Sequence, residues 1–152
     1  DVLTSGQEPV HAAPQAAAKI CEFDFSDRIS DENTRALVFI AELWQGDKLI
    51  SRQTANFAPI KHVSLSDPHV TANLHHEGDQ LIIDLTSQSL ALLVEVSLAD
   101  TDVVFSDNYF NIPAGRTVQI TCPLPAGWTL EQAEKALCLC SVYDSFSHGA
   151  MA

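Results

Sequence analysis

The fold is decided by the stretch Phe105-Ser106-Asp107-Asn108-Tyr109-Phe110-Asn111-Ile112-Pro113-Ala114-Gly115. It joins segments 90–98 and 117–122, in which side chains on one face are apolar and those on the other are more polar. A period of two predicts strands of a sheet with one buried face. Asp and Asn favour turns because their side chains bond nearby backbone, and Gly115 accommodates a positive φ before the second strand. We expect a connection with three aromatic residues to be held against a core or a neighbouring domain.

This stretch resembles the signature of the C-terminal immunoglobulin-like domain of family 2 glycoside hydrolases of the β-mannosidase type, which exo-β-glucosaminidases share. That signature usually reads Phe-Ser-Asp-Asn-Tyr-Phe-Asp followed by an apolar-Pro-Gly-Glu segment. This chain differs from it at Asn111, where Asp is usual, and at Arg116, where Glu is usual. Weaker similarities occur at Pro59 and Lys61 and in the segment 141–144.

The resemblance implies a non-catalytic domain that braces the (β/α)8 barrel of a parent enzyme. It implies that the parent hydrolyses terminal β-mannosides with retention of configuration. It also implies partners within the same parent chain, namely the catalytic barrel and the neighbouring domains. The motif residues are then structural or dock onto another domain, and they are Phe105, Ser106, Asp107, Asn108, Tyr109, Phe110 and Gly115.

The rest of the sequence predicts about eight short strands separated by turns. They are expected over residues 19–25, 36–44, 49–57, 70–76, 81–85, 90–98, 116–122 and 136–143. Thr129 and Gln132 form the pattern of a capping box, which predicts a short helix over 130–135. Strands at this spacing without a βαβ pattern indicate an all-β protein, an immunoglobulin-like antiparallel β-sandwich with one short helix before the last strand.

The domain organisation follows from composition. Residues 1–18 are rich in Ala, Pro, Gln and Gly without a period, so we expect a linker or the tail of a preceding domain. The sandwich is expected over 19–145, followed by a C-terminal tail over 146–152. The sequence starts at Asp1 and its only Met is Met151, so we expect a processed chain or a fragment of a longer protein.

The charge balance excludes two classes of partner. The chain has 20 acidic and 8 basic residues and a net charge of -12. Nucleic acids and anionic membranes both attract basic surfaces, so neither is expected as a partner. No apolar run is long enough to span a membrane, and the first residues lack a signal-peptide pattern. We expect a soluble protein, and its compartment (cytoplasm, periplasm or exterior) stays open.

The four cysteines lie at presumed apolar positions, and we expect buried free thiols at Cys21, Cys122, Cys138 and Cys140. Cys138 and Cys140 are two residues apart and share one face of a presumed strand. A disulfide between neighbouring strands remains an alternative. The spacing does not fit a zinc knuckle, and the sequence predicts no metal and no cofactor.

No catalytic residues are expected in this chain. A glycosidase needs two carboxylates facing each other across the sugar, whereas most acidic residues here fall in turns. The resembled enzymes carry both catalytic Glu residues on a barrel of about 250 residues, for which this chain has no room. The sequence also lacks a nucleophile elbow and a phosphate-binding glycine loop.

Carbohydrate binding is the alternative function, because exposed aromatic rings stack on sugars. The candidates are Trp44, Trp128, Tyr109 and Phe110, and mannose-containing glycans would be the ligands. The competing interpretation is that these rings pack on the core or pin the motif. We expect Tyr109 in particular to be largely buried or docked. A free-standing adhesion or scaffold sandwich is a third interpretation.

Overall fold

The computed structural model describes residues 2–11, 13–14, 17 and 19–147, and the chain divides into two compact units, 1–34 and 35–152. The described part of the first unit contains turns but no helix or strand. The strand predicted over 19–25 is therefore wrong. The rings of Phe23 and Phe25 stack with centroids 6.0 Å apart.

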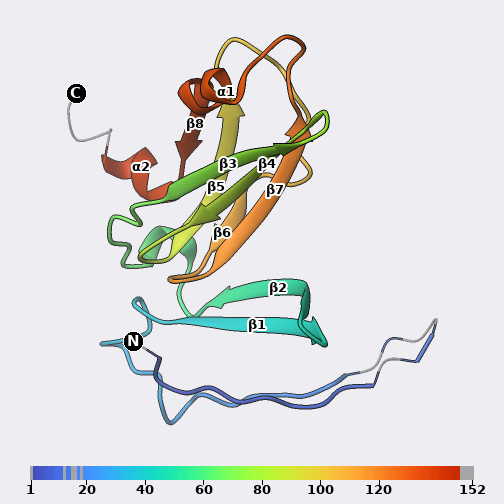
Figure 1. Cartoon of the computed structure of the whole chain (residues 1–152). Coiled ribbons are helices and arrows are strands. Elements are labelled where there is room, and N and C mark those ends of the chain that lie inside the picture. The colour runs from blue at the N-terminus through green and yellow to red at the C-terminus, as the bar shows by residue number, and fades with distance from the viewer. Residues whose placement is uncertain (1, 12, 15–16, 18, 148–152) are drawn as a thin grey trace. The chain divides into compact units, whose positions relative to one another are not determined.

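The second unit contains a sandwich of two three-stranded antiparallel sheets, which confirms the predicted fold (Figure 1). One sheet has the order β3-β4-β7 and the other β6-β5-β8. The bounds are β3 Thr71–Glu77, β4 Gln80–Thr86, β7 Thr117–Pro123, β6 Phe110–Ile112, β5 Ala91–Leu98 and β8 Leu137–Cys140. Both β6 and β7 are edge strands, and the turn 113–116 connects them.

The core lies between the two sheets and is built from apolar side chains of their strands. Leu81, Ile83 and Leu85 of β4 are fully buried, as is Val94 of β5, and Ile120 of β7 is 1% exposed. Burying an aliphatic side chain of this size contributes about 2 kcal/mol. These inward positions therefore hold the two sheets together.

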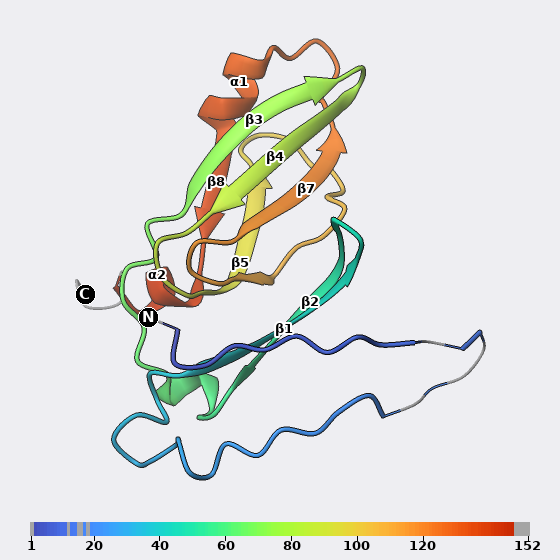
Figure 2. The same cartoon turned by 60° about the horizontal axis from the view of Figure 1, so that its bottom comes forward.

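A separate hairpin precedes the sandwich in the chain, formed by β1 (Val38–Gln45) and β2 (Lys48–Asn56). Its turn contains Gly46 at φ 59°, a backbone conformation that glycine adopts without strain. The sequence predicts a central strand over 36–41, covered on both faces. That prediction is wrong, because among the described strands β1 pairs with β2 alone (Figure 2).

Two helical segments follow β7, and the first confirms its capping signal. Helix α1 (Leu130–Ala136) begins at Thr129, whose side chain and that of Gln132 form a complete capping box. A second helix, α2 (Val142–Ser147), was not predicted. The predicted strand 136–143 is correspondingly shorter, since β8 ends at Cys140.

Hydrogen bonds between Ser141 and Asp144 account for the start of α2, which was not predicted. The Asp144 carboxylate accepts hydrogen bonds from the backbone N–H and the hydroxyl of Ser141, each at 2.7 Å. A Ser followed three residues later by an acidic residue is a helix-start pattern. The segment 141–144 therefore carried a signal for a helix where a strand was expected.

The connection between the hairpin and the sandwich contains a single 3-10 turn, η1 (Ile60–His62), and is bonded at both ends. At its start, the Arg35 Nε donates to the His62 carbonyl at 2.6 Å, and the Ser64 N–H donates to the Arg35 carbonyl at 2.7 Å. At its end, the Gln88 N–H donates to the Pro68 carbonyl at 2.8 Å. This connection is thus tied to the turn after β4 as well as to the residues before β1.

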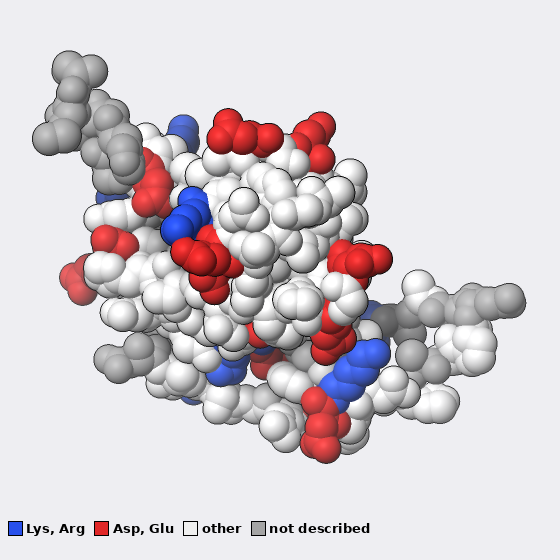
Figure 3. Space-filling model, turned by 45° about the horizontal axis from the view of Figure 1, so that its top comes forward, with Lys and Arg blue, Asp and Glu red and all other residues white. Residues whose placement is uncertain are grey.

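The surface reflects the acidic composition. On the face shown in Figure 3, acidic side chains form small groups, and the basic side chains lie singly among them. Several of the basic groups are paired, such as Lys135 with Glu131 at 2.7 Å. The net charge of -12 favours solubility.

Candidate functional site

The motif residues 105–115 do more than connect two strands, because they include the short edge strand β6. Phe105 and Phe110 are partly buried and pack against the core cluster. Both rings therefore contribute to the packing of the core. The structural or docking role of the motif residues as a set stays a prediction.

Ser106 joins the motif to β7. Its N–H donates to the Thr121 carbonyl at 2.7 Å, and its hydroxyl oxygen accepts from the Thr121 N–H at 2.9 Å. Both polar backbone groups of Thr121 are therefore satisfied by one residue of the loop. An edge strand with unpaired backbone groups invites association with other chains, and Ser106 covers part of this edge.

Asn108 makes the equivalent connection to the other sheet. Its amide oxygen accepts from the Val96 N–H at 2.8 Å, and its amide nitrogen donates to the Val96 carbonyl at 2.9 Å. The side-chain amide thus imitates one residue of a partner strand beside β5. Ser106 and Asn108, two residues apart, bond strands of opposite sheets, and Asp107 between them accepts from the Asn108 N–H.

Gly115 lies in the turn from β6 to β7. Its φ is 69°, so a side chain at this position would be strained even though the surrounding space is open. Its N–H donates to the Ser87 carbonyl at 3.0 Å, and the buried Ser87 hydroxyl donates to the Ile112 carbonyl at 3.1 Å. The turn is therefore fixed to the connection between β4 and β5.

Tyr109 differs from the expectation of a buried ring, because it is 59% exposed. Its φ is 58°, which is uncommon for a residue other than glycine. The phenol O–H donates to Glu95 of β5 at 3.1 Å. That hydrogen bond and the negative charge of Glu95 raise the pKa of Tyr109 above its usual value. The ring is thus oriented on the surface by β5.

Asn111 bridges three elements. Its amide oxygen accepts from the Leu93 N–H of β5 at 2.9 Å, and its amide nitrogen donates to the Thr54 hydroxyl of β2 at 2.6 Å. Leu93 lies in an irregularity of the β5–β6 pairing and has a φ of 49°. Asn111 therefore supports this irregular backbone and connects β6 to the hairpin.

Arg116, the second departure from the family pattern, also contacts the hairpin. Its Nε lies 3.1 Å from Glu42 Oε1, and Arg52 Nε lies 2.7 Å from the same oxygen. Arg52 additionally donates to the Thr117 carbonyl of β7 at 3.0 Å. Burial acts to raise the pKa of Glu42, but the hydrogen bond from Arg52 and the charges of both arginines outweigh it and lower the pKa.

The two tryptophans occupy different environments. Trp128 is partly buried and packs against the core cluster, which matches the packing interpretation. Trp44 of β1 is 50% exposed, and its indole N–H donates to Glu42 Oε2 at 3.4 Å. Only Trp44 of this pair presents a large exposed ring that can stack on a ligand.

The cysteines depart from the expectation of burial at three positions. All four are free, but only Cys122 is buried, and burial raises the pKa of its thiol. Leu137 and Leu139 of β8 face the core, so Cys138 and Cys140 are exposed on the opposite side. The sequence assigned the wrong face of this strand to the core because both faces are apolar.

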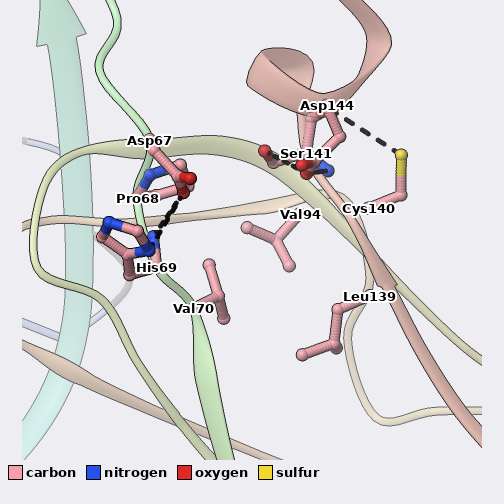
Figure 4. A pocket seen from close by; sticks show the side chains of 9 residues that line it. All are labelled: Asp67, Pro68, His69, Val70, Val94, Leu139, Cys140, Ser141 and Asp144. Atoms are coloured by element: carbon pink, nitrogen blue, oxygen red, sulfur yellow. Dashed lines mark hydrogen bonds and ion pairs between the residues drawn. The ribbon is translucent and has the colours of Figure 1, made fainter. Parts of the chain in front are cut away.

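A hollow of about 230 Å³ lies at one end of the sandwich (Figure 4). Asp67, His69, Cys140 and Asp144 are among its lining residues, and the His69 Nδ1 is 3.5 Å from Asp67 Oδ1. In Figure 4 the Cys140 thiol and the His69 ring lie at opposite sides of the hollow. Among the described residues, no three His, Cys, Asp or Glu side chains are arranged to hold a metal ion.

A family model described as an Ig-fold domain, of the mannosidase type, matches residues 65–145, which is more than half of the sequence. This chain belongs to the mannosidase Ig-fold family. A second model, described as a mannosidase Ig/CBM-like domain, matches residues 1–62. The resemblance of the motif to mannosidase-type immunoglobulin-like domains is therefore confirmed. The domain boundaries 1–18, 19–145 and 146–152 stay a prediction.

The solved structures include a similar fold in the crystal structure of a beta-D-mannosidase from Dictyoglomus thermophilum. The TM-score is 0.65 at 23% sequence identity, and the match covers 76% of this chain and 14% of that enzyme. The mannosidase Ig-fold chain thus spans about a seventh of this relative. No curated protein matches the sequence significantly.

Within the described ranges, no helix has the length and apolar character that a membrane span requires.

Proposed function

We propose that this mannosidase Ig-fold chain is a non-catalytic part of a β-mannosidase-like glycoside hydrolase and that it braces the catalytic barrel and the neighbouring domains. The parent would hydrolyse terminal β-mannosides with retention, using two Glu carboxylates about 5 Å apart on its barrel. The family membership and the β-mannosidase fold support this proposal.

The observation that carries the bracing role is that some motif residues are bonded to the two sheets while another is exposed. Ser106 is hydrogen-bonded to β7 and Asn108 to β5, and these bonds make the motif rigid. Tyr109 is left exposed on its surface. A rigid loop whose aromatic ring is exposed in a fixed orientation is suited to contact another domain.

The experiment begins with the reading frame upstream of the codon for Asp1. The proposal predicts a (β/α)8 pattern with two Glu residues at strand ends, and hydrolysis of an aryl β-mannoside by the protein of the whole frame. The 152-residue chain should show no turnover in the same assay. A frame without a barrel, or turnover by this chain alone, would contradict the proposal.

Carbohydrate binding remains a second candidate because Trp44 is half exposed beside the Glu42 carboxylate and because the region 1–62 matches a model described as Ig/CBM-like. Calorimetric titration with mannose and a β-manno-oligosaccharide separates the candidates. A saturable heat that Trp44→Ala removes and Trp128→Phe retains would favour binding. The bracing role predicts no saturable heat.

A further inference from the structure

The outer face of the β6–β5–β8 sheet has features that the fold by itself does not explain. Leu93 is 42% exposed and Tyr109 is 59% exposed. Both are large side chains outside the core, and they lie on the side of β5 that is opposite to Val94 and Val96. We refer to Leu93, Glu95, Tyr109, Cys138 and Cys140 as the outer patch.

The members of the outer patch are neighbours by strand register and hydrogen bonding. Glu95 of β5 lies opposite Cys140 of β8, and Ser97 lies opposite Cys138. The Tyr109 O–H reaches across to Glu95 at 3.1 Å. The patch therefore extends continuously from β6 across β5 to β8, and the tyrosine ring is held in one orientation over it.

The backbone at the two large residues is strained. Leu93 has a φ of 49° and Tyr109 has a φ of 58°, values that cost about 1 kcal/mol or more for residues other than glycine, Asn and Asp. Asn would adopt either position more easily. Neither side chain belongs to the buried core cluster or packs against it.

The outer patch is continuous with an interface that the chain already contains. Asn111 accepts from the Leu93 N–H and donates to Thr54 of the hairpin. The hairpin lies in the region matched by the Ig/CBM-like model, and Asn111 lies in the Ig-fold region. The same bridging residue thus joins the contact between the hairpin and the sandwich to the strained, exposed patch.

We propose that the outer patch is the docking surface for another domain of the same parent protein, which covers Leu93, Tyr109, Cys138 and Cys140. The inference rests on the proposed bracing function and specifies its contact. The partner surface is apolar at its centre and receives Leu93 and the tyrosine ring. It carries Lys or Arg at its rim, opposite Glu95 and the exposed Asp107. Desolvated aromatic anchors of this kind supply most of the binding energy of such contacts.

The two exposed thiols make the test direct, because they are built-in probes of the patch. In the 152-residue chain, Cys138 and Cys140 should react readily with a maleimide, and the buried Cys122 should not. In the protein of the whole reading frame, docking should slow labelling of Cys138 and Cys140 at least about tenfold. Mass spectrometry of the labelled peptides resolves the sites, and the buried Cys122 serves as the unlabelled control.

The decisive variant is Leu93→Asn, because docking and strain predict opposite effects. In the 152-residue chain, Asn relieves the positive φ, so the melting temperature should rise or stay unchanged. In the whole protein, the same variant should restore labelling of Cys138 and Cys140 and lower the melting temperature of the C-terminal domain. Val104→Asn is the matched control, because Val104 is apolar and 84% exposed but lies outside the outer patch.

Each outcome decides the matter. Equal labelling of Cys138 and Cys140 in the short chain and the whole protein overturns the docking surface, as does protection that Leu93→Asn leaves intact. Protection in a whole protein that hydrolyses no β-mannoside would support the surface while refuting the proposed function. A mannosidase with unprotected thiols would do the reverse.

Discussion

Asn108 offers the sharpest test of how the motif holds the sandwich together. Replacing it with Ala removes the acceptor for the Val96 N–H and the donor for the Val96 carbonyl. Val96 is 1% exposed, so its backbone groups are poorly placed to recover both bonds from water. The consequence of the substitution is two backbone polar groups without partners beside the core.

The magnitude follows from those two groups. A buried polar group that loses its partner costs about 1–3 kcal/mol. Because Asn108 itself is only half-buried, water can partly replace it, and we expect a total loss of about 2–4 kcal/mol in the free energy of unfolding. Domains are stable by about 5–15 kcal/mol, so the variant should fold but unfold at a clearly lower urea concentration.

Asn108→Asp refines the test. A carboxylate still accepts from the Val96 N–H but cannot donate to the Val96 carbonyl, so ionised Asp should destabilise the fold at neutral pH. Protonation of the introduced carboxylate restores a donor. The difference in the free energy of unfolding between the variant and the wild type should therefore become smaller as the pH falls toward about 4. This pH dependence distinguishes loss of the donor from loss of packing.

The assay is urea unfolding of the 152-residue chain, followed by circular dichroism and by the fluorescence of the partly buried Trp128. Asn73→Ala is the matched control, because Asn73 is an exposed residue of β3 and should change the stability by less than about 0.5 kcal/mol. If Asn108→Ala behaves like this control, the side-chain amide does not stand in for a partner strand.

Three further predictions concern other contacts. Glu42→Gln should abolish a stabilisation of about 1 kcal/mol in the free energy of unfolding. The wild type has this stabilisation above the usual Glu pKa and loses it as the pH falls through the lowered pKa of Glu42. If the free energies of unfolding of the two proteins follow the same course between pH 3 and 7, the ion-pair cluster is refuted. Arg116→Gln combined with Thr54→Val should raise amide exchange in the hairpin about tenfold and leave β4 unchanged, with Lys135→Gln as the control; equal changes in both elements would argue against a local joint. Thr129→Ala should cost about 1 kcal/mol by removing the cap of α1, and Thr129→Ser should retain most of it.

The sequence alone determined the sandwich, and it did so because the inner faces of its strands are consistently apolar. Alternation over 94–98 and 118–122 specified which side chains point inward, and the motif specified the family. At 91–92 the irregularity in the β5–β6 pairing changes the faces, and Ala91 lies in the core cluster instead of Leu92. The Thr129 capping box located α1 because capping depends only on residues close in sequence. Glycines in the turns fixed the hairpins for the same local reason.

Tertiary structure decided the features that depend on pairing between distant segments. Residues 19–25 alternate like a strand but form none in the part of the chain that the structure describes. Strand β8 is apolar on both faces, so only its packing on the core assigns Leu139 inward and Cys140 outward. Asn108, Asn111 and Arg116 were visible as motif positions, yet their partners on β5, β2 and β1 lie far away in the chain. Period and local propensity carry no information about which surface a half-exposed ring such as Tyr109 will meet, because that depends on whatever packs against it.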